Sequence, residues 1–129
     1  MKLCLDTCAY SRLLIGNPRL QTRMEEADFL VIPAIVLGEL HTGFEAGTRR
    51  MENEERLALF LETPHVRTQD VNWDIARRYG VVVNQLRRMG KPIPTNDIWI
   101  AATALELGAR LITYDAHFNQ IPGLIIESP

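Results

Sequence analysis

The stretch between Pro94 and Phe118 constrains the fold of this chain more than any other. Apolar residues recur in its first half at the three- and four-residue spacing of a helix: Ile98, Ala101, Ala102 and Leu105. Thr95 or Asn96 is a natural N-terminal cap for this helix, and Gly108 stands where a C-terminal glycine is expected. The pattern therefore predicts one helix with defined ends.

A short apolar strand is expected directly after that helix, over residues 111–113. Asp97 falls in the first turn of the helix, and Asp115 lies just past the strand. Each end of this helix–strand unit therefore carries one carboxylate.

Strand-like and helix-like segments alternate along the rest of the chain. Residues 2–6 form a short apolar run closed by an acid, which is typical of a central strand in a parallel sheet. Further strands are expected at 29–32, around Val66 and at 124–126, and helices at 7–15, 19–27, 34–46, 49–62 and 70–89. This alternation predicts an α/β fold with a mostly parallel sheet, in which ligands bind outside the carboxyl ends of the strands.

Two helix starts can be predicted from single residues. Pro33 stands at the favoured first position of the helix over 34–46, and Asp70 is expected to cap the helix over 70–89. The packing residues expected on the second helix are Trp73, Ile75, Ala76, Tyr79, Val82, Val83 and Leu86.

The size and charge of the chain limit its functions. Its 129 residues are enough for one domain with a real core, so a single domain over 1–129 is expected. Lys and Arg number 14 against 16 Asp and Glu, a formal charge of −2. A protein that binds nucleic acid by neutralising phosphates alone is usually basic. A nucleic-acid function here needs another source of attraction, such as a bound cation.

The sequence also indicates a compartment. Met1 and Lys2 run straight into a short apolar stretch ended by Asp6, which is not a signal-peptide pattern, and no apolar run approaches the ~20 residues needed to span a bilayer. If Cys4 lies in an extended strand, the four residues to Cys8 span up to ~13 Å, too far for a disulfide. Two free thiols suit a reducing cytoplasm.

Four acids are expected to converge at one edge of the sheet. Asp6 ends the first strand, Asp115 follows another strand, and Asp97 opens a helix at the same edge. Glu39 lies two turns into the helix that follows the second strand. Carboxylates gathered at one spot repel each other unless a divalent cation intervenes. Mg²⁺ or Mn²⁺ prefers carboxylate oxygens, and such a site can polarise a phosphodiester and activate water.

Each of these acids has an ordinary structural explanation when taken alone. Asp6 and Asp115 are common turn residues, Asp97 is an acid favoured at a helix N-terminus, and Glu39 is a typical solvated helix residue. Their joint pattern favours a site, because small hydrogen-bonding residues stand beside them: Thr7, Thr95, Asn96 and Thr113.

Four short motifs resemble those of PIN-domain proteins, and above all those of the VapC-type toxins of bacterial and archaeal toxin–antitoxin pairs. The motifs are Leu5-Asp-Thr7, Gly38-Glu-Leu40, Thr95-Asn-Asp97 with the following Ile98-Trp-Ile-Ala-Ala102, and Thr113-Tyr-Asp-Ala-His-Phe118. Each is weak alone, but the four occur in order over the whole chain. The resemblance implies a PIN-like three-layer fold with a central, mostly parallel five-stranded sheet flanked by helices.

The resemblance also implies a function. The family's activity is that of an endoribonuclease dependent on Mg²⁺ or Mn²⁺, with Asp6, Glu39, Asp97 and Asp115 as catalytic and metal-binding residues. Thr113 would orient the site and Phe118 would pack beneath it. The family forms homodimers and binds an antitoxin of the VapB type, whose tail blocks the acidic pocket. Cys8 departs from the pattern, because many relatives have a small polar residue there.

Other residues have two interpretations. Arg87, Arg88 and Lys91 precede the loop that leads to Asp97, and they are either contacts for RNA phosphates or solvated cations at a helix end. Trp99 could stack on a base or contact a partner protein. His117, two residues past Asp115, could approach the acidic pocket, although surface exposure is the expectation.

Two other functions compete with a ribonuclease. A phosphatase or phosphotransferase could use Asp6 as nucleophile, but enzymes of the haloacid-dehalogenase type need a second acid two residues later, where this chain has Cys8. A catalytically inactive PIN-like module that binds RNA or protein is the other alternative, and the presence of all four acids argues against it.

Overall fold

A computed structural model describes residues 1–129. Five strands form one sheet in the order β3-β2-β1-β4-β5, and every neighbouring pair is parallel. The strands are β1 (Lys2–Leu5), β2 (Phe29–Pro33), β3 (Val66–Gln69), β4 (Arg110–Ile112) and β5 (Ile126–Glu127). The helices are α1 (Thr7–Leu14), α2 (Pro18–Glu26), α3 (Ala34–Ala46), α4 (Arg50–Leu61), α5 (Trp73–Met89), α6 (Thr95–Leu107) and the 3-10 helix η1 (Ala116–Gln120). The expected five-stranded parallel sheet is confirmed.

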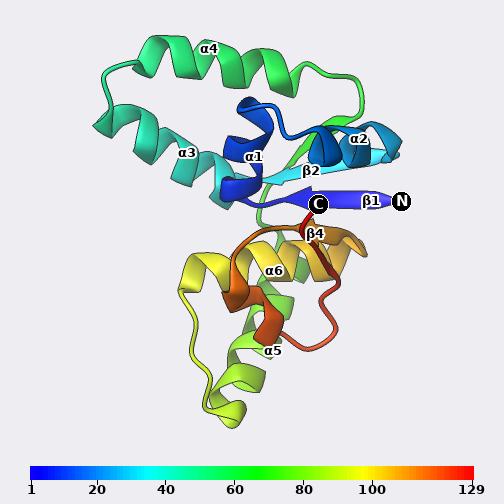
Figure 1. Ribbon diagram of the computed structural model, residues 1–129. Coiled ribbons are helices and arrows are strands. Elements are labelled where there is room, and N and C mark those ends of the chain that lie inside the picture. The colour runs from blue at the N-terminus through cyan, green and yellow to red at the C-terminus, as the bar shows by residue number, and fades with distance from the viewer.

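Helices cover both faces of the sheet, as three layers require. In Figure 1, α1 to α4 lie above the strands and α5 and α6 lie below them. The start of α1, the start of α6 and η1 all lie on the side to which the β1 arrow points. Since all strands are parallel, this side is the carboxyl edge of the sheet, where ligands bind in folds of this kind.

Strand β1 is the centre of the core. Leu3, Cys4 and Leu5 have no exposed surface, because β1 has a strand on each side and helices on both faces. Helix α6 is buried on nearly all sides, so its apolar residues are not confined to one face of the helix. Asp97, the acid in the first turn of α6, therefore belongs to a well-buried helix.

Three predicted details of the helix starts are wrong. Asn72, not Asp70, caps α5, and its side chain accepts a hydrogen bond from the Ile75 N–H at 2.9 Å. Pro94 occupies the cap position of α6, so that Thr95 is already helical and no side chain caps this end. Pro33 is the last residue of β2 and stands just before α3 instead of within it.

Fewer residues of helix α5 are buried than the sequence predicts. Trp73 is 82% exposed and Ala76 is also exposed, although both were expected to pack. At 100° per residue, Trp73 lies about 200° around the helix from the buried Ile75. Tyr79 packs on the neighbouring α6, where its ring stacks on that of Trp99 with centroids 3.8 Å apart. Trp99 is therefore engaged within the molecule.

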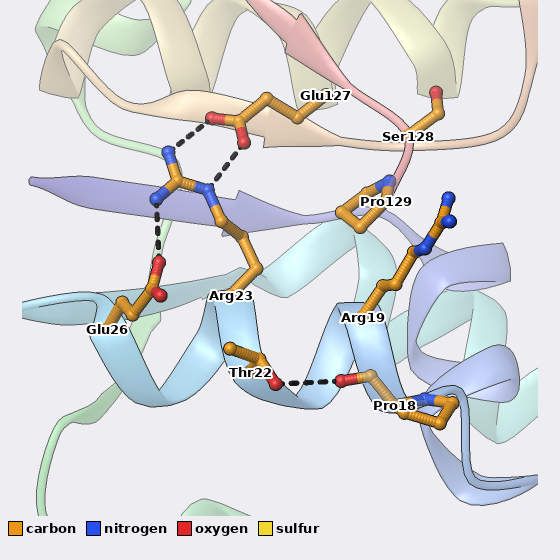
Figure 2. A pocket seen from close by; sticks show the side chains of 8 residues that line it. All are labelled: Pro18, Arg19, Thr22, Arg23, Glu26, Glu127, Ser128 and Pro129. Atoms are coloured by element: carbon orange, nitrogen blue, oxygen red, sulfur yellow. Dashed lines mark hydrogen bonds and ion pairs between the residues drawn. The ribbon is translucent and has the colours of Figure 1, made fainter.

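The C-terminal strand is fixed by an ion pair that lines a surface hollow of about 580 Å³. Figure 2 shows Arg23 of α2 facing Glu127 of β5 across this hollow. The Arg23 guanidinium donates two hydrogen bonds, from Nε to Oε1 at 2.5 Å and from Nη2 to Oε2 at 2.8 Å. Paired fork geometry of this kind is the strong form of a salt bridge.

We expect Glu127→Gln to lower the melting temperature by a few degrees at neutral pH. The hydrogen bonds from Arg23 hold the pKa of Glu127 below its usual range, so the carboxylate contributes stability above the pKa of the unfolded chain. That contribution is lost as the pH falls through the lower pKa of the folded state. Thermal unfolding of both proteins between pH 3 and 7 measures the difference. Glu52→Gln breaks an exposed pair with Arg56 and is the control, with little change expected.

Candidate active site

Asp6 is the most buried of the four acids, with 6% of its surface exposed. It follows β1 directly and caps the N-terminus of α1. Its Oδ1 accepts a hydrogen bond from the Thr7 N–H at 2.7 Å. Its Oδ2 accepts two more, from the Thr113 hydroxyl at 2.8 Å and from the Cys8 thiol at 3.3 Å. Two donors from the start of α1 and one from the residue just after β4 therefore fix the orientation of this carboxylate.

Thr113 connects Asp6 to the other side of the site. Its buried hydroxyl donates to Asp6 and accepts a hydrogen bond from the Asp115 N–H at 3.1 Å. The Thr113 carbonyl in turn accepts a hydrogen bond from the Ser128 hydroxyl at 2.6 Å. One hydroxyl thus sets the spacing between the end of β1 and the segment after β4.

Asp97, Asp115 and His117 bring three ligand-type atoms together at this edge. One such atom from each residue lies within 4.8 Å of the other two. The imidazole Nδ1 is 3.2 Å from Asp97 Oδ2 and 3.2 Å from Asp115 Oδ1. Asp115 Oδ1 also accepts the His117 N–H at 2.9 Å, because Asp115 caps η1.

The pKa of Asp97 is raised above its usual value, mainly by burial. Burial raises this pKa, and the nearby carboxylates of Asp115 and Asp6 raise it further. The hydrogen bond to His117 opposes the rise without cancelling it. Two of the other predicted acids are thus close enough to Asp97 to disfavour its charged form.

Glu39 reaches the site through Thr7. Its Oε1 accepts a hydrogen bond from the Thr7 hydroxyl at 2.7 Å, and Thr7 is the neighbour of Asp6 in the chain. The Glu39 side chain is half-buried on α3. It lies outside the cluster that Asp97 and Asp115 form with His117.

Several other predicted residues stay outside these contacts. The Asn96 side chain is exposed and makes no hydrogen bond, because the helix already begins at Thr95. Arg87, Arg88 and Lys91 are exposed and form no ion pair. Phe118 is fully buried within η1, between the segment that carries Asp115 and His117 and the core.

Two residues have a larger part in the site than the sequence predicts. His117 is exposed as expected, yet its ring lies against Asp97 and Asp115. Its position two residues after Asp115 is the sequence feature that points to this contact. Cys8 stands two residues past Asp6, and the first turn of α1 brings its thiol back onto the same carboxylate. Burial and the charge of Asp6 raise the Cys8 pKa, so this thiol stays protonated and acts as a donor.

The donor set fits a divalent cation. Carboxylate oxygens are the ligands that Mg²⁺ and Mn²⁺ prefer, and imidazole nitrogen is a ligand for the later first-row metals. A cation would also relieve the repulsion from Asp115 and Asp6, which adds to the effect of burial on the pKa of Asp97. The cluster opens at the surface, with half of the His117 side chain exposed, so that water and a substrate can reach it.

The chain is similar to known proteins over most of its length. The family model of the PIN domain matches residues 3–124. Ribonuclease VapC1 of Haemophilus influenzae (strain R2866) is 34% identical over 125 residues, which are 93% of this chain and 92% of that protein. The chain belongs to the PIN-domain family, as a VapC-type member.

Solved structures agree with this VapC-type assignment. VapBC-1 from nontypeable Haemophilus influenzae is 31% identical, and the match covers 99% of this chain and 98% of that one with a TM-score of 0.88. VapBC2 from Rickettsia felis, solved bound to a DNA fragment from its promoter, is 27% identical with 98% coverage of both chains and a TM-score of 0.87. None of the helices of the VapC-type chain combines the length and apolarity that a membrane crossing needs.

Proposed function

We propose that this VapC-type protein is a metal-dependent endoribonuclease and the toxin of a toxin–antitoxin pair, with residues 1–129 as one PIN domain. The observation that carries the proposal is the meeting of Asp97, Asp115 and Asp6 at the carboxyl edge of the sheet. The relatives named as ribonucleases supply the reaction class, because the match with VapC1 spans nearly the full length of both chains.

Each acid has a place in this proposal. Asp97 and Asp115 would hold Mg²⁺ or Mn²⁺ together with Asp6, which Thr7, Cys8 and Thr113 orient. When bound, the cation supplies Lewis-acid polarisation of the phosphodiester and lowers the pKa of water. Glu39 stands beside Asp6 through Thr7, where its carboxylate can bind the same cation or take a proton from the attacking water. The cation also attracts RNA phosphates to a protein whose formal charge is −2.

The proposed partners follow from the solved complexes. VapBC-1 and VapBC2 were both solved as assemblies of the VapB and VapC type. From these complexes we propose a VapB-type antitoxin as partner. The family resemblance further leads us to propose that the antitoxin covers the acidic site and that the toxin is a homodimer, and the two free cysteines lead us to propose a cytoplasmic location. Arg87, Arg88 and Lys91 remain candidates for contacts with RNA phosphates, because their charges are unpaired and exposed.

Cleavage of RNA with and without the cation tests this function. Purified protein, stripped of metal with chelator, is incubated with end-labelled RNA in Mg²⁺, in Mn²⁺ or in neither. We expect fragments with internal cut sites only when a cation is present, and their loss when excess chelator is added. Metal-independent cleavage would contradict the proposed mechanism. Binding of RNA without cleavage under every cation would favour the inactive PIN-like module.

A further inference from the structure

We propose that Ser128 is a positioning residue of the candidate active site: its hydroxyl replaces a backbone donor that Pro129 lacks, and it thereby holds Thr113 against Asp6. Thr113 is the residue whose hydroxyl connects Asp6 with Asp115. The inference rests on the proposed ribonuclease function, and it adds to the site a residue that follows β5.

The ladder between β4 and β5 leaves one backbone group without a donor. The Leu111 N–H donates to the Ile125 carbonyl at 2.8 Å, and the Thr113 N–H donates to the Glu127 carbonyl at 3.1 Å. In a parallel ladder of this register, the next hydrogen bond would run from the N–H of residue 129 to the Thr113 carbonyl. Residue 129 is a proline, which has no N–H. The regular ladder therefore cannot satisfy the Thr113 carbonyl.

The Ser128 hydroxyl takes the place of this missing donor. It donates to the Thr113 carbonyl at 2.6 Å. Thr113 is only 1% exposed, so this carbonyl needs a partner within the protein. The Tyr114 hydroxyl donates to the Pro129 carbonyl at 2.7 Å and keeps the chain after Ser128 beside the same segment. Both backbone groups of Thr113 are thereby bonded to the two residues before Pro129.

The backbone of Thr113 determines where its hydroxyl points. With its N–H and carbonyl both fixed, the Cα–Cβ bond has one direction, and a β-branched side chain has few rotamers about it. The hydroxyl then donates to Asp6 Oδ2 at 2.8 Å and accepts the Asp115 N–H at 3.1 Å. Loss of the Ser128 hydrogen bond should let Thr113 turn, and this would misplace the Asp6 carboxylate relative to Asp115.

Thr22 provides a matched control in the same surface hollow. Figure 2 shows the Thr22 hydroxyl facing Pro18, to whose carbonyl it donates at 3.0 Å, on α2. Like Ser128, it is a side-chain hydroxyl that lines the hollow and binds a backbone carbonyl. Its hydrogen bond stays within α2, however, and does not reach Thr113. Thr22→Val removes this hydroxyl and keeps the shape of the side chain.

Restoring the backbone donor separates positioning from the mere loss of a side chain. Pro129→Ala gives residue 129 an N–H that can donate to the Thr113 carbonyl as in a regular parallel ladder. The kcat and KM for cleavage of one labelled RNA in Mn²⁺ are measured for the parent, Ser128→Ala, Ser128→Thr, Ser128→Ala/Pro129→Ala and Thr22→Val. We expect Ser128→Ala to lower kcat about tenfold and to change KM less than about twofold. Ser128→Thr and the double variant should recover most of the loss, and Thr22→Val should cleave as the parent does.

Amide hydrogen exchange, followed by NMR, tests the same contacts without RNA or metal. The Asp115 N–H donates to the Thr113 hydroxyl, so it should exchange at least about tenfold faster in Ser128→Ala and at the parental rate in the double variant. The Leu30 N–H of β2 donates to the His65 carbonyl at 2.9 Å, on the other side of β1 from β4. It should exchange equally in all variants, because the expected change is local.

Three results would overturn the inference. One is a parental kcat and parental Asp115 exchange in Ser128→Ala. Another is an equal loss in Ser128→Ala and in the double variant, which would mean that the hydroxyl does not stand in for a backbone donor. The third is faster exchange of the Asp115 and Leu30 amides alike, which would indicate general destabilisation. The expected exchange pattern in proteins that cut no RNA would leave the role of Ser128 standing and refute the ribonuclease proposal instead.

Discussion

Asp97→Asn is expected to reduce RNA cleavage by about a thousandfold or more while leaving the protein folded. The amide is a weaker metal ligand and carries no charge, so it removes one anchor of the proposed cation and the transition-state stabilisation that depends on it. Initial rates of cleavage in Mn²⁺, measured on one labelled RNA, give the ratio. Among the four acids, Asp97 is the strongest test, because it meets both Asp115 and His117.

The same substitution should not destabilise the metal-free protein. The pKa of Asp97 is raised in the fold, so its charged form is disfavoured relative to the unfolded chain. A carboxyl group of this kind costs stability as the pH rises through its unfolded and then its folded pKa. At pH 7 the neutral amide should therefore keep the melting temperature of the metal-free protein or raise it by a few degrees. Below about pH 3 the difference between the two proteins should vanish.

Adding Mn²⁺ separates the two effects. The parent protein should gain stability by mass action, about 2.7 kcal/mol at a hundred times the dissociation constant, and Asp97→Asn should gain much less. Asp70→Asn removes one exposed carboxylate that makes no hydrogen bond or ion pair and is the control, expected to cut and to bind as the parent does. Cleavage by Asp97→Asn at the parental rate would refute the catalytic assignment of Asp97.

Much of this fold could be predicted from the sequence because its apolar runs are short and strongly patterned. The short apolar run at β1 indicates a buried strand, and the apolar periodicity of α6 indicates a helix. The helix predicted over 34–46 has the same bounds as α3. The meeting of Asp6 with Asp115 followed from one rule, that parallel strands end at one edge. Asp97 joined them because α6 starts at that edge.

The remaining details depend on how neighbouring elements pack, which local patterns do not specify. Trp73 is exposed because it lies on the side of α5 away from the buried Ile75, and which side is buried depends on how α5 packs on its neighbours. The choice between Asp70 and Asn72 as cap depends on where the chain turns after β3. His117 reaches Asp97 only because η1 turns the chain back towards α6. The hydrogen bond from Cys8 to Asp6 forms because α1 begins directly after Asp6, which the sequence pattern alone does not specify.

Phe118→Ala is expected to destabilise the protein by about 3–5 kcal/mol, the usual cost of removing a fully buried phenyl ring. Against a typical total of 5–15 kcal/mol, this loss is large enough to populate unfolded protein near physiological temperature. Urea unfolding at 25 °C measures it, with Phe118→Leu expected to lose less because it leaves a smaller cavity. Trp73→Ala, which removes a larger ring from an 82% exposed position, should change stability by less than about 0.5 kcal/mol.

Phe118→Ala should also weaken metal binding at the candidate site. Phe118 lies in η1, which follows Asp115 and contains His117, so a cavity beneath it loosens both of these residues of the candidate site at once. Under conditions where Phe118→Ala is still folded, we therefore expect weaker Mn²⁺ binding, whereas the equally folded Trp73→Ala should bind as the parent does. Unchanged Mn²⁺ affinity in folded Phe118→Ala would mean that the hydrogen bonds of Thr113 and Asp115 position the site without support from the core.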